Sequence, residues 1–154
     1  MELEFRETQL TDLEALFELR AATRENPLSR DALARLGITP ESTARDLSSG
    51  RTKGWVCTHD SRVVGFCTGD SQTGEIRVLA ILPDYEARGI GKRLLCLVVD
   101  WLRMTGAQRI WLAASSDPTV RAHGFYRALG WQPNGEHTEN GDEILELHAH
   151  AIRS

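Results

Sequence analysis

Residues 81–95 read ILPDYEARGIGKRLL, and this stretch decides which fold the chain can adopt. An apolar run ends at Pro83, and Gly89 and Gly91 stand where that run passes into a helical pattern. The first N–H groups of a helix have no partner within it and carry the positive end of the helix dipole. Glycines let an anion approach those groups closely, and Arg88 and Lys92 add positive charge. The segment therefore predicts a loop that binds a phosphate or pyrophosphate.

Two other phosphate-binding motifs fail on spacing. A P-loop needs Ser or Thr directly after its lysine, whereas Arg93 follows Lys92. The dinucleotide-binding fingerprint would place its third glycine at Leu94, and no acidic residue about 20 positions later ends a predicted strand. Taken alone, the two glycines remain compatible with a plain turn before a helix.

The pattern of apolar residues around this loop predicts one domain over residues 1–154. The first half is predicted to contain a strand at 3–6, a helix opened by a capping box of Thr11 and Glu14, and two short helices capped by Ser29 and by Thr39. Strands are predicted at 55–57, 63–67 and 75–82, followed by a helix at 89–104 and a strand at 109–113. The last elements are a helix from Asp117-Pro118 to Gly130 and a strand with Leu145, Leu147 and Ala149. This order predicts an α/β (α+β) fold with a mixed central sheet that has helices on its faces.

Composition narrows the class of partner. A net charge of −4 and a pI near 5.7 argue against nucleic acid or an anionic membrane as the main partner. The longest apolar run, 94–99, is far too short to span a bilayer, and the first ten residues lack a signal-peptide pattern, so a cytoplasmic location is expected.

Potential metal and redox ligands are sparse. Cys57, Cys67 and Cys96 lack any CxxC spacing and are expected to be reduced core residues. His148 and His150 share one side of the last predicted strand, but two ligands make no metal site, so no metal is predicted.

Residues 86–91, Glu-Ala-Arg-Gly-Ile-Gly, resemble the pyrophosphate-binding signature of the GNAT superfamily of N-acetyltransferases. The resemblance covers residues 54–131, and the order of elements in the whole chain agrees with it. It implies a mostly antiparallel sheet in which two splayed strands open a slot for acetyl-CoA. The implied cofactor-binding residues are Leu79, Ala80 and Ile81 along the pantetheine arm, and Glu86, Ala87, Arg88, Gly89, Ile90, Gly91 and Lys92 around the pyrophosphate.

Two positions depart from the family pattern. The signature usually begins with Gln or Arg, so the carboxylate of Glu86 predicts weaker cofactor affinity or a side chain turned outward. The Asn that often precedes the second motif is absent, and Thr119 stands at the expected place as the cofactor-binding candidate.

The resemblance also supplies candidates for the chemistry. The backbone N–H of Ile81 would stabilise the oxyanion, and Tyr126, in a stretch that resembles the second motif, would protonate the leaving thiolate. Glu75 would remove the proton of the amine, with Asp70 as a residue that could share this role or bind a cationic substrate. A tyrosine packed at a helix end and an exposed carboxylate after a turn are the competing interpretations.

The sequence thus predicts an acetyl-CoA-dependent N-acetyltransferase that acts on a primary amine of a small molecule by direct attack in a ternary complex. A protein N-terminus or lysine as acceptor, and a catalytically weak acyl-CoA-binding sensor or partner module, are the alternatives. Specificity is expected from Arg20, Arg24, Glu25 and Asn26, with Trp55 and a loop at 131–140 as walls. The apolar helix from Leu94 and the final strand suggest a homodimer.

Overall fold

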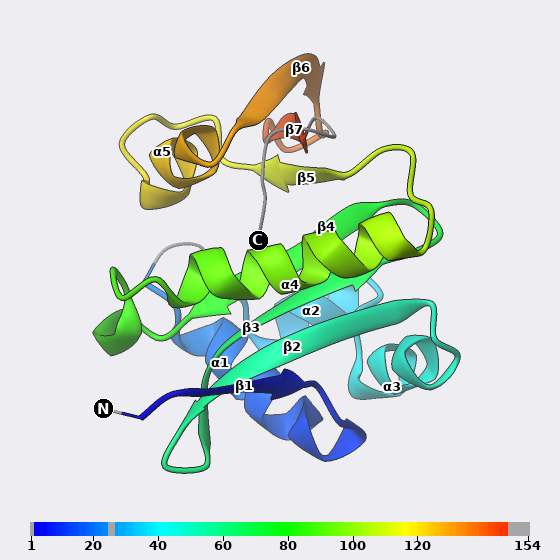
Figure 1. Ribbon diagram of the computed structural model, residues 1–154, viewed down its shortest axis with the longest axis vertical. Coiled ribbons are helices and arrows are strands. Elements are labelled where there is room, and N and C mark those ends of the chain that lie inside the picture. Colours follow the sequence, from blue (N-terminus) through cyan, green and yellow to red (C-terminus); the bar gives the residue numbers. More distant parts are fainter. Residues whose placement is uncertain (1, 25–26, 148–154) are drawn as a thin grey trace.

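A seven-stranded sheet in the order β1-β2-β3-β4-β5-β7-β6 organises the chain (Figure 1). The computed structural model describes residues 2–24 and 27–147. Its strands are β1 (Glu4–Glu7), β2 (Thr52–His59), β3 (Arg62–Asp70), β4 (Glu75–Ile81), β5 (Trp111–Ala114), β6 (Trp131–His137) and β7 (Glu143–Leu147). The pair of β4 and β5 is parallel and the other pairs are antiparallel. The mixed, mostly antiparallel sheet is therefore confirmed.

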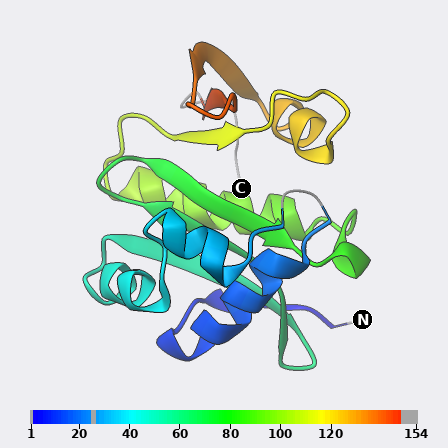
Figure 2. The same ribbon diagram turned by 180° about the vertical axis from the view of Figure 1, so that it is seen from behind.

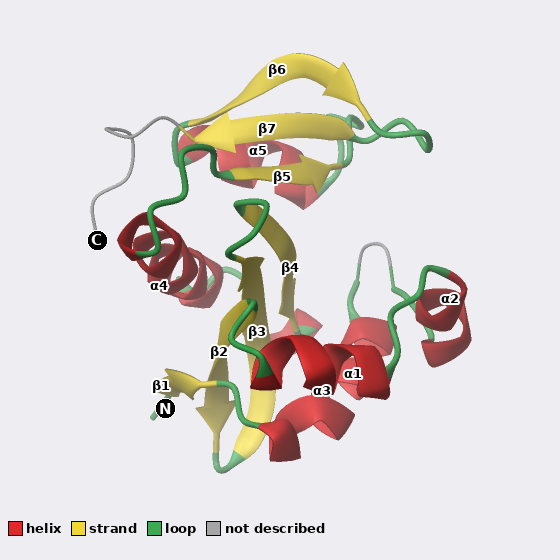
Figure 3. Ribbon diagram, turned by 90° about the vertical axis from the view of Figure 1, so that its right-hand side faces the viewer, coloured by secondary structure: helices red, strands yellow, loops and turns green. Residues whose placement is uncertain are grey.

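Helices cover both faces of this sheet. Three of them, α1 (Leu13–Ala22), α2 (Arg30–Arg35) and α3 (Pro40–Ser48), lie on one face of β2–β4, and α4 (Ile90–Met104) lies on the other (Figures 2 and 3). The helix α5 (Arg121–Ala128) lies beside the half of the sheet formed by β5–β7, and two 3-10 turns, η1 (Leu10–Asp12) and η2 (Pro83–Tyr85), complete the described elements. None of the described helices is both long enough and apolar enough to cross a membrane.

The core is centred on α4, which explains its apolar sequence. Leu94, Leu95, Val98, Val99 and Leu102 are fully buried, because the spacing of three and four residues places them on the side of the helix that meets the sheet. Burying each such side chain stabilises the fold by about 2 kcal/mol. Cysteines 57, 67 and 96 are free and buried, as predicted.

The structure corrects three predicted boundaries. The predicted capping box of Thr11 and Glu14 does not form, because Thr11 lies inside the 3-10 turn η1. In this turn the side chain of Asp12 accepts the N–H of Gln9 at 2.7 Å. Asp117 instead accepts the N–H and hydroxyl of Thr119, and α5 begins only at Arg121. The expected loop at 131–140 is largely the strand β6, whose Pro133 is tolerated because the strand lies at an edge of the sheet.

The strands β4 and β5 touch at one end and then separate. Their register contains one pair, Glu75 with Trp111, and beyond it the strands diverge (Figure 3). Gly74 makes the closed end tight: an added Cβ there would lie 1.8 Å from the carbonyl oxygen of Arg109, and its φ is +77°. Only glycine allows this approach, which fixes the point from which the slot between β4 and β5 opens.

Candidate functional site

A cleft of about 510 Å³ fills the slot between β4 and β5. The start of α4, the turn η2, α5 and the C-terminal end of α1 complete its walls. Most of the predicted cofactor residues line it, namely Leu79, Ala80, Ile81, Glu86, Ala87, Gly89, Ile90, Gly91 and Lys92, together with the predicted acid Tyr126. The tertiary structure therefore brings together segments that are more than 40 residues apart in the sequence.

The main chain of β4 offers hydrogen-bonding groups to this cleft. The N–H of Leu82 donates to the carbonyl oxygen of Val64 at 2.9 Å, and the same register continues along β3 to Ala80 and Leu79. Because hydrogen-bonded and non-hydrogen-bonded pairs alternate in an antiparallel ladder, Ala80 pairs with β3 while Leu79 and Ile81 direct their amides to the other side. Of the three predicted main-chain contacts, Leu79 and Ile81 face the cleft with their amides, and Ala80 does not.

The N-terminus of α4 lies at one end of the cleft, and its geometry is suited to bind an anion. Ala87 and Gly89 have φ values of +62° and +79°, so the loop alternates between left-handed and ordinary conformations before the helix begins at Ile90. Such an alternation turns successive N–H groups toward one point, where an anion can bind. Apart from its chain neighbours, no described residue has an atom within 4 Å of where a Cβ on Gly89 would be, so that approach is open.

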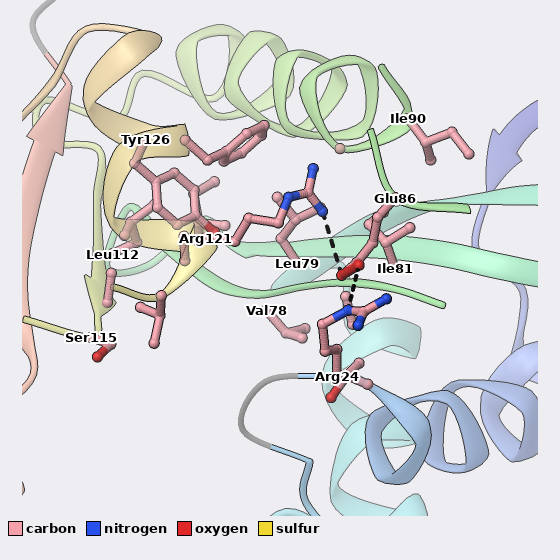
Figure 4. A pocket seen from close by; sticks show the side chains of 18 of the residues that line it. Arg24, Val78, Leu79, Ile81, Glu86, Ile90, Leu112, Ser115, Arg121 and Tyr126 are labelled. Carbon is pink, nitrogen blue, oxygen red and sulfur yellow. Dashed lines mark hydrogen bonds and ion pairs between the residues drawn. The ribbon is translucent and has the colours of Figure 1, made fainter. Parts of the chain in front are cut away.

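Glu86 reaches across the mouth of this cleft between two arginines. Its carboxylate lies 2.9 Å from Nε of Arg24, which follows α1, and 3.4 Å from Nη1 of Arg121 in α5 (Figure 4). The side chain of Glu86 is 17% exposed. The prediction of an outward-turned Glu86 is thus wrong, because the carboxylate lines the cleft and forms ion pairs with cations from two of its walls.

Tyr126 presents its hydroxyl group to the cleft from α5. Its ring packs edge-on against Phe125 and Trp131, with centroids 5.1 and 6.1 Å away. The hydroxyl makes no hydrogen bond to any residue in the part of the chain that the structure describes. Burial raises the pKa of Tyr126, and nearby Cys67 adds to this, so the phenol stays protonated at neutral pH.

A second cavity of about 400 Å³ lies under α1, α2 and α3. It meets the cleft at Arg20, Arg77 and Val78, which line both. The predicted base Glu75 lines this second cavity. Burial raises the pKa of Glu75, although the charge of Arg77 opposes this effect.

Asp70 is not available to share the role of Glu75. Its side chain is 1% exposed and is neutralised by Arg51 and Arg77 at 3.0 and 2.7 Å, and it also accepts the N–H of Gln72. It lines neither the cleft nor the second cavity. The buried carboxylate therefore serves to hold the strands together.

Some predicted residues lie elsewhere. Arg88 stacks over Tyr85 with its guanidinium carbon 5.2 Å from the ring centroid, and Thr119 turns to Asp117. Neither lines the cleft.

Of the predicted specificity residues, Arg20 and Arg24 line the cleft. Trp55 lies under Lys53 on β2, away from both cavities. Glu25, Asn26, His148 and His150 lie outside the described residues, and the described part of the chain has no group of three metal-binding side chains.

Sequence reasoning missed part of the far wall of the cleft. Ser115 and Asp142 contribute to it from loops around β5 and β7, and Asn140, the last residue of the predicted wall at 131–140, lines the cleft as well. No local motif marks these residues, because their place depends on how the second half of the sheet meets the first.

The family model of the acetyltransferase (GNAT) family matches residues 13–131, which include most of the cleft lining, the helix α4 and the tyrosine of α5. The chain belongs to this GNAT family. The GNAT chain is 34% identical over 83 residues to an uncharacterised N-acetyltransferase of Mycobacterium bovis, an alignment that covers 52% of this chain and 53% of that relative. It is 35% identical over 72 residues to the mycothiol acetyltransferase of Beutenbergia cavernae, with 47% of this chain and 24% of that relative covered. The aligned part is thus about half the length of the mycobacterial relative.

Solved structures show the same fold. The PaiA N-acetyltransferase of Thermoplasma acidophilum, in complex with coenzyme A, superposes with a TM-score of 0.78 at 24% identity, covering 96% of this GNAT chain and 99% of that one. The acetyltransferase yncA of Salmonella typhimurium, with acetyl-CoA, has a TM-score of 0.70 at 17% identity and covers 99% of both chains.

Proposed function

We propose that this GNAT protein transfers the acetyl group of acetyl-CoA to a primary amine of a small molecule by direct attack in a ternary complex. The observation that carries the proposal is the cleft between β4 and β5, which has an anion-binding helix terminus at one end and the Tyr126 hydroxyl on its wall. The structures of two fold neighbours, solved with coenzyme A and with acetyl-CoA, support the cofactor assignment.

The residues of the cleft fit acetyl-CoA. The N–H groups at the start of α4 and the Lys92 side chain would hold the pyrophosphate. The backbone amides of Leu79 and Ile81, which face the cleft, would pair with the pantetheine arm. Acetyl-CoA supplies the acetyl group as a thioester, which is already activated for attack by an amine.

Three groups of the chain would assist that attack. Glu75, at the other end of β4 from Ile81, would accept the proton of the ammonium through intervening water. This proton must leave because a protonated amine has no free electron pair. The N–H of Ile81 would donate to the carbonyl oxygen as negative charge develops on it. The hydroxyl of Tyr126, which is protonated and makes no hydrogen bond to a described residue, would give its proton to the thiolate that leaves and would regain one from the nitrogen of the tetrahedral intermediate as the amide forms.

The limited volume of the second cavity favours a small acceptor over a protein N-terminus or lysine. It has a volume of about 400 Å³ and adjoins the cleft at Val78, where the acceptor could meet the thioester. A sensor without catalytic activity would need neither this second cavity nor an unbonded phenol beside the first.

The proposal is tested by titrating the purified protein with acetyl-CoA in a calorimeter and then measuring CoA release with a panel of amines. We expect binding in the micromolar range, about −8 kcal/mol, and amine-dependent CoA release. Binding without release by any amine would favour the sensor, and the absence of binding would contradict the proposal altogether.

A further inference from the structure

Four charged side chains line the second cavity, and only two of them have an oppositely charged partner within the described residues. Arg77 lies 3.0 Å from Asp46 and 2.7 Å from Asp70, so its charge and that of Asp46 are neutralised within the fold. The remaining two are the guanidinium of Arg20 and the carboxylate of Glu75. Across residues 2–24 and 27–147, neither of these side chains forms a hydrogen bond or an ion pair.

Arg20 stands out among the arginines around the two cavities. Arg24 and Arg121 pair with Glu86, and Arg77 pairs with aspartates, whereas Arg20 is half-buried without a counter-charge among the described residues. Burial lowers the pKa of Arg20, and no described carboxylate offsets this effect. A guanidinium held out of water without a partner is costly, so a fold that retains one gains from an anion that binds there.

The second cavity also has an apolar wall, beside polar side chains such as Ser42 and Thr68. Leu16, Phe17, Leu33 and Phe66 contribute to its walls, and Leu36 and Ile38, which also line it, are 68% and 38% exposed. Exposed apolar side chains at the edge of a cavity are suited to the hydrocarbon part of a ligand. The cavity therefore offers one cation, one anion and an apolar wall.

We propose that the acceptor is a small amino-carboxylate, whose carboxylate binds Arg20 while its amine faces Glu75 and its hydrocarbon part lies against the apolar wall. This inference rests on the proposed function and names the chemical class of its acceptor. Arg20 suits a carboxylate because its planar guanidinium can donate two parallel hydrogen bonds. Since Arg20 lines the cleft as well, a carboxylate there keeps the amine near the thioester. A polyamine is disfavoured, because its additional ammonium groups would lie near Arg20 and Arg77.

The test compares matched pairs of acceptors that differ only in the carboxylate. Leucine is paired with isopentylamine, phenylalanine with phenylethylamine, and 6-aminohexanoate with pentylamine, so that short and long separations of amine and carboxylate are sampled. Acetyl-CoA-dependent CoA release is measured for the wild type, for Arg20→Gln and for Arg45→Gln. Arg45 is an exposed residue of α3 that lines neither cavity, so Arg45→Gln removes the same charge elsewhere.

We expect kcat/KM of the wild type to be about tenfold to a hundredfold higher for at least one amino-carboxylate than for its partner amine, the factor that one charge-assisted hydrogen bond provides. Arg20→Gln should lower kcat/KM for the amino-carboxylate far more than for its partner amine and so remove most of this preference, and Arg45→Gln should keep it. The Tm of Arg20→Gln should be unchanged or higher, because an unpaired, half-buried charge is removed. A merely structural Arg20 would instead lower the Tm and reduce the rates with both acceptors alike.

Different results would overturn the acceptor class and the transferase activity. If simple amines or polyamines are acetylated as well as the amino-carboxylates, or if Arg20→Gln leaves the preference intact, the acceptor class is wrong and the transferase remains. If acetyl-CoA binds and no amino-carboxylate is acetylated, the acceptor class is likewise overturned. If acetyl-CoA does not bind in the calorimeter, the proposed function itself fails.

Discussion

Tyr126 places a hydroxyl in the cleft that the fold does not use for its own stability. The ring packs against Phe125 and Trp131, whereas the oxygen makes no hydrogen bond to a described residue. Replacing the phenol by a phenyl ring should therefore leave the packing intact. Removing the hydroxyl oxygen of Tyr126 therefore tests its chemical role without disturbing the packing of its ring.

We expect Tyr126→Phe to lower kcat about a hundredfold, the usual contribution of a general acid. The dissociation constant of acetyl-CoA, measured by calorimetry, should stay within about twofold, and the Tm within about 1 °C, because no hydrogen bond of the fold is lost. An unchanged kcat would remove Tyr126 from the chemistry and leave it as a packing residue.

Glu86 is the residue at which this chain departs most from the family signature. Its carboxylate occupies Arg24 and Arg121 at the mouth of the cleft and adds a negative charge near the expected pyrophosphate. Glu86→Gln should remove a negative charge from the cleft and tighten acetyl-CoA binding about fivefold at low salt, which corresponds to about 1 kcal/mol for charges near a protein surface. The gain should shrink at 1 M salt because of screening. Weaker binding by Glu86→Gln in a titration would show that the carboxylate organises the arginines for the cofactor.

At the scale of elements, the loop before α4 and the divergence of β4 from β5 create the site. The loop stores backbone strain at Ala87, whose φ of +62° is unusual for a residue with a side chain. This strain turns N–H groups toward the cleft at the helix terminus, where an anion would bind. The geometry of the loop therefore serves binding more than stability.

Gly89→Ala should weaken acetyl-CoA binding at least tenfold, because a Cβ would point into the open space in front of the helix. Its conformational cost should be about 1 kcal/mol. Gly106→Ala is the matched control, since Gly106 has a φ of +86°, has no neighbour within 4 Å of an added Cβ and lies outside the cleft. Calorimetry together with thermal melts separates the two effects: equal loss of affinity in both variants would exclude a specific role of the loop.

At the scale of the whole molecule, Asp70 connects three parts of the chain. It binds Arg51, just before β2, and Arg77 of β4, while Arg77 also binds Asp46 of α3. Burial alone would raise the pKa of Asp70, but the hydrogen bonds from Arg51 and Gln72 and the charge of Arg77 outweigh it, so its pKa lies below the ordinary 3.8. Asp12, hydrogen-bonded to Arg6, also has a lowered pKa.

A carboxyl group whose pKa is lower in the folded state stabilises that state above its unfolded pKa, and the contribution is lost as pH falls through the folded pKa. The free energy of unfolding should therefore decrease between about pH 5 and pH 2. Asp70→Asn should lower it by about 2 kcal/mol at pH 7 and flatten the decrease in acid. Urea titrations across this range measure both effects, and an acid dependence identical to that of the wild type would contradict this assignment.

Local sequence determined the elements whose signals are local. The caps at Ser29 and Thr39 and the glycines before α4 were predictable because a cap and a helix terminus each depend on a few neighbouring residues. The edge strand β6 was missed because Pro133 and Gly135 have the composition of a loop, and only pairing with β7 makes the segment a strand.

The sequence by itself determined that this chain has a GNAT fold with a glycine-containing turn before α4, since the spacing of Gly89 and Gly91 and the apolar face of α4 are properties of contiguous residues. Only the tertiary structure decided which charges cancel and which remain. Glu86 forms ion pairs with Arg24, which follows α1, and with Arg121 of α5. Asp70 forms ion pairs with Arg51 and Arg77. The side chains of Arg20 and Glu75 have no such partner among the described residues. The physical reason is that an ion pair requires atoms within about 4 Å, and that distance is fixed by the packing of elements far apart in the chain.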